Sequence, residues 1–191
     1  MRRSGITYPI LAASLLVAGC GTVTPYQPNL ARQKIPGGYS ERRLSPDSFE
    51  VSFAGTRPTS PEVVERYLLY RAAELTLQSG FDWFMVGDHW VERDAYTYIS
   101  PNSSFSIRYG AGYGEWRTYW RLFRYRLGAG KIAGDPLWWQ KTNPRDVRRI
   151  EARSVIRMRG GPFPAGEPRG FDARKVIADL TPLIRVPTSV P

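Results

Sequence analysis

The sequence predicts an α+β fold, in which a largely antiparallel sheet carries one long helix (about 61–78) and a short C-terminal helix (about 172–181) packed on it. Residues 48–53 alternate polar and apolar side chains, as a half-buried strand does. Strand-like segments then follow one another between residues 81 and 159, without helical segments between them. Consecutive strands favour antiparallel pairing, so we expect the helices to cover one face of the sheet.

The helix at residues 61–78 has clear boundary signals. Ser60 can cap its first turn, Pro61 suits the first helical position, and Gly80 suits the end. Apolar residues at helical spacing form one stripe: Val64, Leu68, Ala72 and Leu75. We expect this stripe to face the core, with Leu68 and Leu75 fully covered.

The other elements are strands and a late helix. The strand candidates are residues 81–86, 96–99, 104–109, 116–127 and 148–159. From Ile150 to Met158 the even positions are mostly apolar and the odd positions mostly charged, which predicts a strand with one buried face and one wet, basic face. Asp172 is expected to cap the late helix, which runs through Leu180 and ends before Pro182.

Composition excludes several kinds of site. The 191 residues carry a net charge of +10, with one cysteine and one histidine. A single cysteine excludes an internal disulfide framework and a cysteine-based zinc site, and a single histidine excludes a histidine-cluster metal site. His89 follows Asp88, but neighbours in a strand point to opposite faces, so this pair does not by itself orient a catalytic base.

The remaining polar motifs also lack the pattern of an active site. The carboxylates of Asp88, Glu92 and Asp94 are expected to form a solvated acidic edge, with cation binding or a catalytic carboxylate pair as the functional alternative. Glycine clusters at residues 110–114 and 128–131 are expected to be loops, because neither has the spacing of a dinucleotide-binding turn or a P-loop. We therefore expect no enzyme activity and no cofactor or metal.

The first twenty residues resemble a bacterial lipoprotein signal. Arg2 and Arg3 precede an uncharged, mainly apolar run over residues 6–19, which suits a signal-peptide core and is too short to span a membrane. The run ends in Leu-Val-Ala-Gly before Cys20, which is similar to a lipobox. By this resemblance the signal is cut before Cys20, whose thiol receives a diacylglycerol and whose new amino group is acylated.

The expected organisation has four parts. These are a signal peptide (1–19), a lipidated flexible tether rich in Pro and Gly (20–46), one α+β domain (47–185) and a tail (186–191). Loss of the signal leaves 25 basic and 17 acidic residues, a charge of +8. Gly21 stands where Asp would favour the inner membrane, so by resemblance to lipoprotein sorting the protein is expected on the outer membrane, facing the periplasm.

Three segments resemble a family of proteobacterial envelope lipoproteins that has no assigned biochemistry. They are Gly38-Tyr39-Ser40-Glu41, the stretch YLLYRAAELTL at residues 67–77 with Gly80-Phe81 after it, and FDARKVIADL at residues 171–180. The resemblance spans about residues 37–181, and the YLLYRAAELTL stretch is its most specific part. It implies a small α+β lipoprotein domain and brings no catalytic or ligand-binding residues with it.

Two sets of charged residues are candidate sites. Arg71 and Glu74 lie three residues apart on a covered helix, which predicts a structural ion pair, with an anion or carboxylate seat beneath the sheet as the functional alternative. Arg153, Arg157 and Arg159 occupy odd positions of one strand and are expected to project from one face, where they could bind anions.

These observations predict a lipid-anchored protein of the cell envelope that acts as a non-enzymatic structural or interaction module. The alternative is a protein that binds an anionic envelope component, such as a lipid headgroup, a lipopolysaccharide phosphate or an acidic polymer, through the basic strand face. The expected partners are the membrane, through the N-terminal lipid, and an envelope protein or anionic polymer. An envelope address argues against nucleic acid as a partner.

Overall fold

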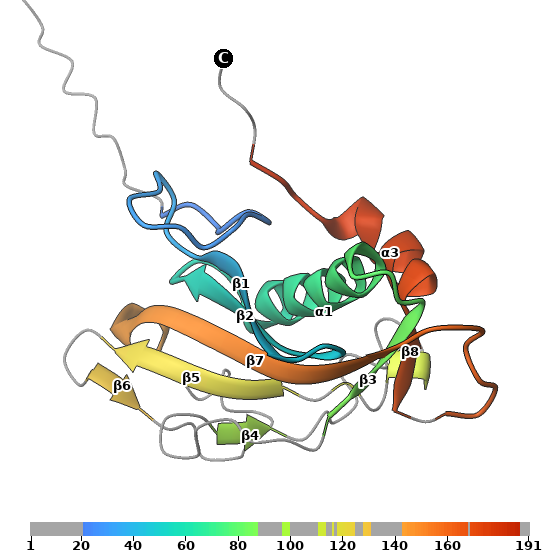
Figure 1. Ribbon diagram of the computed structural model, residues 1–191. Coiled ribbons are helices and arrows are strands. Elements are labelled where there is room, and N and C mark those ends of the chain that lie inside the picture. The colour runs from blue at the N-terminus through green and yellow to red at the C-terminus, as the bar shows by residue number, and fades with distance from the viewer. Residues whose placement is uncertain are drawn as a thin grey trace, which may run out of the picture.

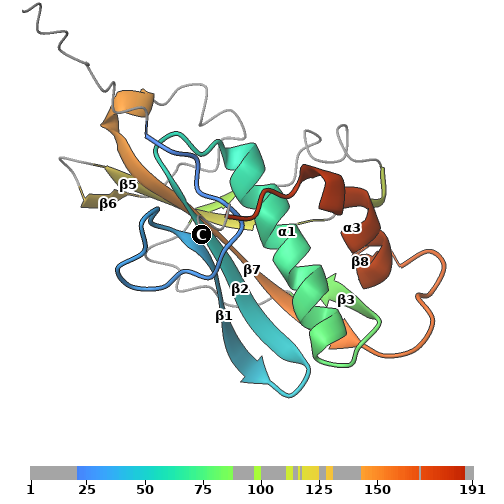
Figure 2. The ribbon, with the colours of Figure 1, turned by 90° about the horizontal axis from the view of Figure 1, so that it is seen from above.

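The computed structural model describes residues 21–87, 97–99, 111–113, 116, 118–124, 128–130, 143–167 and 169–187. In these residues an antiparallel sheet forms one layer, and the helices α1 (Pro61–Gln78) and α3 (Ala173–Leu180) form the other (Figure 1). Seen from above, α3 lies beside α1 on the same face of the sheet (Figure 2). The chain therefore has an α+β fold, as the order of its elements predicted.

The sheet is organised around its longest strand, β7 (Val147–Arg159). β7 pairs with β2 (Ser48–Thr56) along one edge, and with β3 (Trp83–Val86) and β5 (Thr118–Arg124) along the other. The strands farther out are β1 (Gly38–Ser45), β4 (Thr97–Ile99), β6 (Gly128–Gly130) and β8 (Gly170–Asp172). All the pairings between these named strands are antiparallel.

Most of the strand predictions can be compared with this sheet. The strand expected at residues 148–159 is β7, and β5 covers the middle of the segment 116–127. The glycines expected to form a loop at residues 128–131 instead contribute β6, because backbone pairing with β5 requires no side chains. The candidate strand at residues 104–109 lies outside the described residues.

Helix α1 begins and ends where its sequence signals predicted. The Ser60 hydroxyl accepts a hydrogen bond from the Val63 backbone nitrogen at 3.4 Å, and Pro61 occupies the first turn. Gly80 follows the helix with a φ of 81°, which favours glycine. The predicted stripe is buried, and Leu68 has no exposed surface. Neighbouring Leu69 and Tyr67 are also buried, because α1 is covered by the sheet, by α3 and by the N-terminal segment.

Helix α3 is capped by Asp172, whose carboxylate accepts a hydrogen bond from the Lys175 backbone nitrogen at 3.0 Å. The α-helix ends at Leu180 and a single 3₁₀ turn, Thr181–Leu183, follows it with Pro182 inside. Val176 and Leu180 turn inward against α1, so α3 extends the core beyond the first helix.

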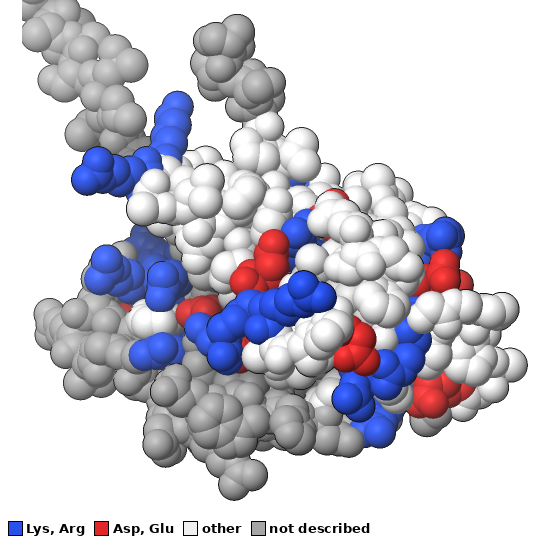
Figure 3. Space-filling view, viewed as in Figure 1, with Lys and Arg blue, Asp and Glu red and all other residues white. Residues whose placement is uncertain are grey.

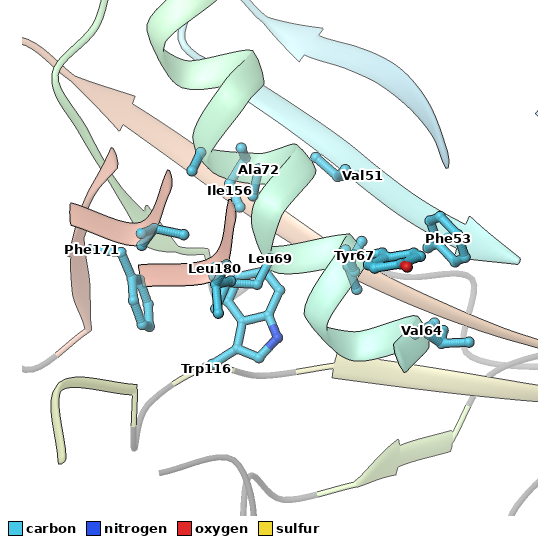
Figure 4. Close-up of a cluster of buried hydrophobic side chains, with 14 of the residues drawn as sticks. Val51, Phe53, Val64, Tyr67, Leu69, Ala72, Trp116, Ile156, Phe171 and Leu180 are labelled. Atoms are coloured by element: carbon cyan, nitrogen blue, oxygen red, sulfur yellow. The ribbon is translucent and has the colours of Figure 1, made fainter. Parts of the chain in front are cut away.

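The core lies between the helices and the sheet (Figure 4). Val51 and Phe53 of β2 and Ile156 of β7 lie on the face of the sheet that α1 covers, and they share one cluster with Val64, Tyr67, Leu69 and Ala72 of α1. Trp116 and Phe171 close the end below α3, with ring centroids 5.7 Å apart in an edge-to-face arrangement. This continuous apolar layer fixes the face of the sheet that the helices cover.

The structure corrects the expectation of a flexible tether over residues 20–46. Residues 38–45 of that segment form β1, which pairs with β2 from Gly38↔Ala54 to Ser45↔Ser48. Upstream of β1, Thr24, Pro25 and Tyr26 are buried against the domain. The folded part therefore starts more than twenty residues before Asp47.

A turn at Gly37 and Gly38 lets the N-terminal segment pack closely against the domain. Gly37 and Gly38 have φ values of 98° and 125°, which L side chains rarely adopt. A Cβ at Gly37 would lie 2.3 Å from the Ala54 carbonyl oxygen, and one at Gly38 would lie 2.2 Å from that of Gln27. The glycines that suggested flexibility are therefore needed for close packing.

Candidate functional site

The three arginines predicted to bind anions lie on the face of β7 that is turned away from the helices, and each is paired with a carboxylate. Arg153 Nη1 lies 2.8 Å from Glu50 Oε1, and its Nη2 lies 3.1 Å from Glu151 Oε1. Arg159 Nη1 lies 2.6 Å from Asp47 Oδ2, and Arg157 Nε lies 3.5 Å from the same oxygen. The strand face is therefore not a row of unpaired cations.

These pairs belong to a larger array, which we call the charge ladder: Arg42, Asp47, Glu50, Arg149, Glu151, Arg153, Arg157 and Arg159. Each carboxylate in it lies between two guanidinium groups. Glu50 also contacts Arg42 at 3.2 Å, and Glu151 also contacts Arg149 at 3.8 Å. Figure 3 shows red and blue side chains interleaved over this part of the surface.

The ladder connects strands that are far apart in the sequence. Glu50 is on β2, Arg42 on β1, and Arg153 on β7, and Ser52 lies directly opposite Arg153 in the β2–β7 register. A glutamate on the central part of a sheet is costly to bury unless it is paired, and the Glu50 side chain is only 6% exposed. Arg42 and Arg153, which flank Glu50, therefore have a structural role: they neutralise its buried charge.

A shallow hollow of about 200 Å³ lies over the ladder. Its lining residues are Ser40, Glu41, Arg42, Glu50, Ser52 and Arg153. The hydroxyls of Ser40 and Ser52 lie 2.7 Å apart and hydrogen bond to each other. Both cations of this hollow, Arg42 and Arg153, already contact the Glu50 carboxylate, and its negative charge disfavours the entry of an anion.

The Arg71–Glu74 pair forms as the sequence spacing predicted, within a cluster on the other side of the sheet. Arg71 Nη1 lies 3.1 Å from Glu74 Oε2, and its Nη2 lies 3.0 Å from Glu41 Oε1 on β1. The Arg71 guanidinium stacks on the ring of Tyr39, 4.4 Å from its centroid. The Tyr26 hydroxyl donates a hydrogen bond to the Glu74 carboxylate. Only 8% of the Arg71 side chain is exposed.

The contacts in this cluster keep Arg71 positively charged and the Tyr26 hydroxyl protonated. Burial lowers the pKa of Arg71, but the hydrogen bond and charge of Glu41, with help from Tyr26 and Glu74, outweigh it and keep that pKa above its usual value. Burial and the hydrogen bond to Glu74 raise the pKa of the Tyr26 phenol, which stays protonated and remains a donor. Arg71 therefore stays charged and joins α1 to β1 and to the N-terminal segment.

A second set of contacts fixes the N-terminal segment, and the sequence analysis did not identify it. The Thr24 backbone nitrogen donates to the Thr59 hydroxyl at 2.8 Å, and the Thr24 hydroxyl accepts from the Thr56 backbone nitrogen at 2.9 Å. The Thr56 hydroxyl donates to the carbonyl oxygen of Thr22 at 2.9 Å. We call Thr22, Thr24, Thr56 and Thr59 the threonine clamp. The repeated threonines at residues 22–24 and 56–59 are the sequence signal that could have suggested it.

The clamp continues into contacts with the C-terminal segment. The Tyr26 backbone nitrogen donates to the Arg185 carbonyl oxygen at 2.7 Å, and the Arg185 backbone nitrogen donates to the Tyr67 hydroxyl at 3.1 Å. The ring of Tyr26 packs among three other tyrosine rings, those of Tyr39, Tyr67 and Tyr70. The two terminal segments are therefore held together on α1.

Several sequence candidates lie outside the described residues. These are Cys20, Asp88, His89, Glu92 and Asp94. Within the described residues, no group of three or more His, Cys, Asp or Glu side chains is placed to hold a metal ion.

No helix in the described part of the chain has the length and apolar character needed to cross a membrane. Comparisons with models of protein families, with curated proteins and with solved structures find no match for this chain.

Proposed function

We propose that this protein is a lipoprotein of the bacterial cell envelope, anchored through an acylated Cys20, in which the α+β domain acts as a non-enzymatic structural or interaction module. The observation that carries the proposal is the sequence around Cys20, where a short apolar run after Arg2 and Arg3 ends in a lipobox-like Leu-Val-Ala-Gly-Cys. Two or three acyl chains give stable membrane attachment, because each buried methylene contributes ~0.8 kcal/mol.

The described surface supports a module rather than a catalyst. The charged side chains of the sheet face pair with one another across strands, and the buried Arg71 pairs with Glu41 and Glu74. Catalysis needs polar groups that converge on a space where a substrate can sit. The hollow at Glu50 is shallow, and its polar groups are already bonded to each other.

The alternative, an anion-binding protein that uses the basic strand face, has weaker support. The arginines proposed for it, Arg153, Arg157 and Arg159, share Asp47, Glu50 and Glu151 as partners. An anion bound there would compete with Asp47, and with Glu50, whose pair with Arg153 joins β2 to β7.

Fractionation of the native host, or of a bacterium that expresses the full chain, tests the proposal. The wild-type protein is expected in the membrane fraction, with a lipid mass on the N-terminal peptide that begins at Cys20. The variant Cys20→Ser is expected to lose that lipid and to leave the outer-membrane fraction. An unmodified Cys20, or unchanged fractionation of Cys20→Ser, would contradict the proposal.

A further inference from the structure

The proposed lipid lies much closer to the folded domain than a flexible tether over residues 20–46 would place it. Thr22 is only two positions after Cys20, and its carbonyl oxygen already accepts a hydrogen bond from Thr56. Two residues span at most ~7 Å even when fully extended. A domain anchored at Cys20 is therefore held against the bilayer, and the surface around Thr22 is the part nearest to the lipid.

The surface nearest to Thr22 is built by three segments, which we call the terminal face: residues 21–37, 56–59 and 181–187. The threonine clamp joins the first two segments, and the Tyr26–Arg185 hydrogen bond joins the first and the third. In Figure 1 the first and third segments lie on the helix side of the sheet, at the top. The charge ladder is on the opposite face of the sheet.

The terminal face carries positive charge without acidic residues. None of its three segments contains Asp or Glu. Its cations are all exposed, and among the described residues none of them forms an ion pair: Arg32, Lys34, Arg57 and Arg185. Figure 3 shows blue side chains without red neighbours over the loop at the upper left. The pairing seen in the charge ladder is absent from this described surface.

The terminal face also holds most of the exposed apolar side chains. Of the six large hydrophobic residues that are exposed in the described chain, four lie here: Val23 (44%), Leu30 (64%), Leu183 (39%) and Val186 (67%). The other two are Leu44 and Phe163. Exposed apolar residues interspersed with cations match the boundary between lipid headgroups and acyl chains, where both kinds of side chain are stabilised.

We infer that the terminal face is the membrane-docking surface of this protein and that it binds an anionic lipid surface. The inference rests on the proposed acylation of Cys20, which brings this face to the bilayer. Arg32, Lys34, Arg57 and Arg185 then face headgroup phosphates, and Leu30 and Val186 enter the interfacial region. The sheet face with the charge ladder points away from the membrane.

Site-specific labels on the acylated protein test this orientation. Acylation converts the Cys20 thiol to a thioether, so a cysteine introduced elsewhere becomes the only free thiol of the chain. A fluorophore is placed at Leu30→Cys and, as the matched control, at Leu44→Cys. Leu44 is also an exposed leucine, but it lies six residues along β1 from Gly38, a distance of ~20 Å.

Both labelled proteins are reconstituted in phosphatidylcholine vesicles with and without phosphatidylglycerol, each containing a nitroxide headgroup lipid as quencher. We expect at least threefold stronger quenching at residue 30 than at residue 44, and a larger difference in the anionic vesicles. Equal quenching, or stronger quenching at residue 44, would overturn the inference.

Two charge variants with the same loss of charge test the role of the cations. Arg32→Asn with Lys34→Gln should reduce the quenching of the Leu30→Cys label in anionic vesicles to the level seen in neutral ones. Asn suits position 32, whose φ is 63°. Arg157→Gln with Arg174→Gln, which are elsewhere on the surface, should leave the quenching unchanged. An equal effect of the two pairs would overturn the assignment to this face.

Mass spectrometry of the N-terminal peptide distinguishes a failure of the proposed function from a failure of the proposed docking surface. If Cys20 carries no lipid, the proposed function fails and the docking surface fails with it. If Cys20 is acylated but the Leu30→Cys label stays in water, the anchor stands and only the docking surface is wrong.

Discussion

Arg71 joins three parts of the molecule through one side chain. It contacts Glu74 on its own helix, Glu41 on β1, and the ring of Tyr39, and it is nearly fully buried. A buried charge that loses its partners is costly, and so are the partners that remain behind. The sequence spacing predicted the local partner, Glu74, but Glu41 is thirty residues away and depends on the strand that was not expected.

Replacing Arg71 with Ala should destabilise the protein by ~3 kcal/mol, because two partly covered carboxylates and the hydroxyl of Tyr26 lose a shared partner. Urea unfolding would measure this loss. As a control, Lys175→Ala removes a similar helical pair with Asp179, but that lysine side chain is 68% exposed, so the expected change is below ~0.5 kcal/mol. Equal losses for the two variants would contradict a structural role for Arg71.

Leu68 is a position at which the contribution of the core to stability can be measured. It is fully buried between α1 and the sheet, so Leu68→Ala should cost ~2–5 kcal/mol of the free energy of unfolding, from lost burial and the cavity that remains. Leu75→Ala, on the same stripe, should fall in the same range. Leu44→Ala, at an exposed position, should change stability by less than ~0.5 kcal/mol. Losses below half a kcal/mol at both core positions would show that the stripe is not buried.

The N-terminal segment is an element without regular structure, and the threonine clamp holds it. Thr24→Val keeps the shape of the side chain but removes the oxygen that accepts from the Thr56 backbone nitrogen and donates to Pro36. A buried amide without a partner costs ~1–3 kcal/mol, which is the expected loss in unfolding free energy. Thr22→Val is the matched control, because Thr22 contributes only its backbone oxygen to the clamp.

The turn between β1 and β2 is tied to the end of β7 through Asp47. A hydrogen bond from Ser45, followed by one from Arg159, lowers the pKa of the Asp47 carboxyl below its usual 3.8. A lowered folded-state pKa gives stability that is present above pH ~4 and is lost as the pH falls through the folded value. Equilibrium unfolding between pH 5 and pH 2 should therefore show a smaller acid loss for Asp47→Asn than for the wild type. An unchanged acid loss would contradict this role of Asp47.

The elements differ in how much of them the sequence could predict. The caps of α1 and α3 are local signals, and the alternation in β7 is visible because its two faces meet core and solvent. β1 gives no such signal, because polar residues occupy both of its faces and its pairing uses the backbone. The charge ladder depends on the β2–β7 register, which brings Glu50 beside Arg153 across 103 residues.

At the scale of the whole molecule, the segment around Tyr26 and the segment around Arg185 pack against each other and cover α1. Arg185 bonds to Tyr26 and Tyr67, so residues 184–187 complete the cover of the N-terminal segment. Deleting residues 184–191 should lower the free energy of unfolding by ~1–3 kcal/mol, because buried backbone partners are lost. Deleting residues 188–191 alone should have no comparable effect. Unfolding of the two shortened chains in urea, compared with the full chain, measures the difference.

The threonine clamp also determines how the fold responds to a force applied at Cys20. A pull at Cys20 would load the Thr22 contact first, then those of Thr24, and then those of Tyr26, so these contacts yield in sequence rather than together. Release as far as Gly37 would free residues 21–37, an extension of ~55 Å, while β1 stays paired with β2. If Cys20 carries the proposed lipid, mechanical load would thus convert residues 21–37 from a packed segment into a tether, and the domain could move away from the bilayer without unfolding its sheet.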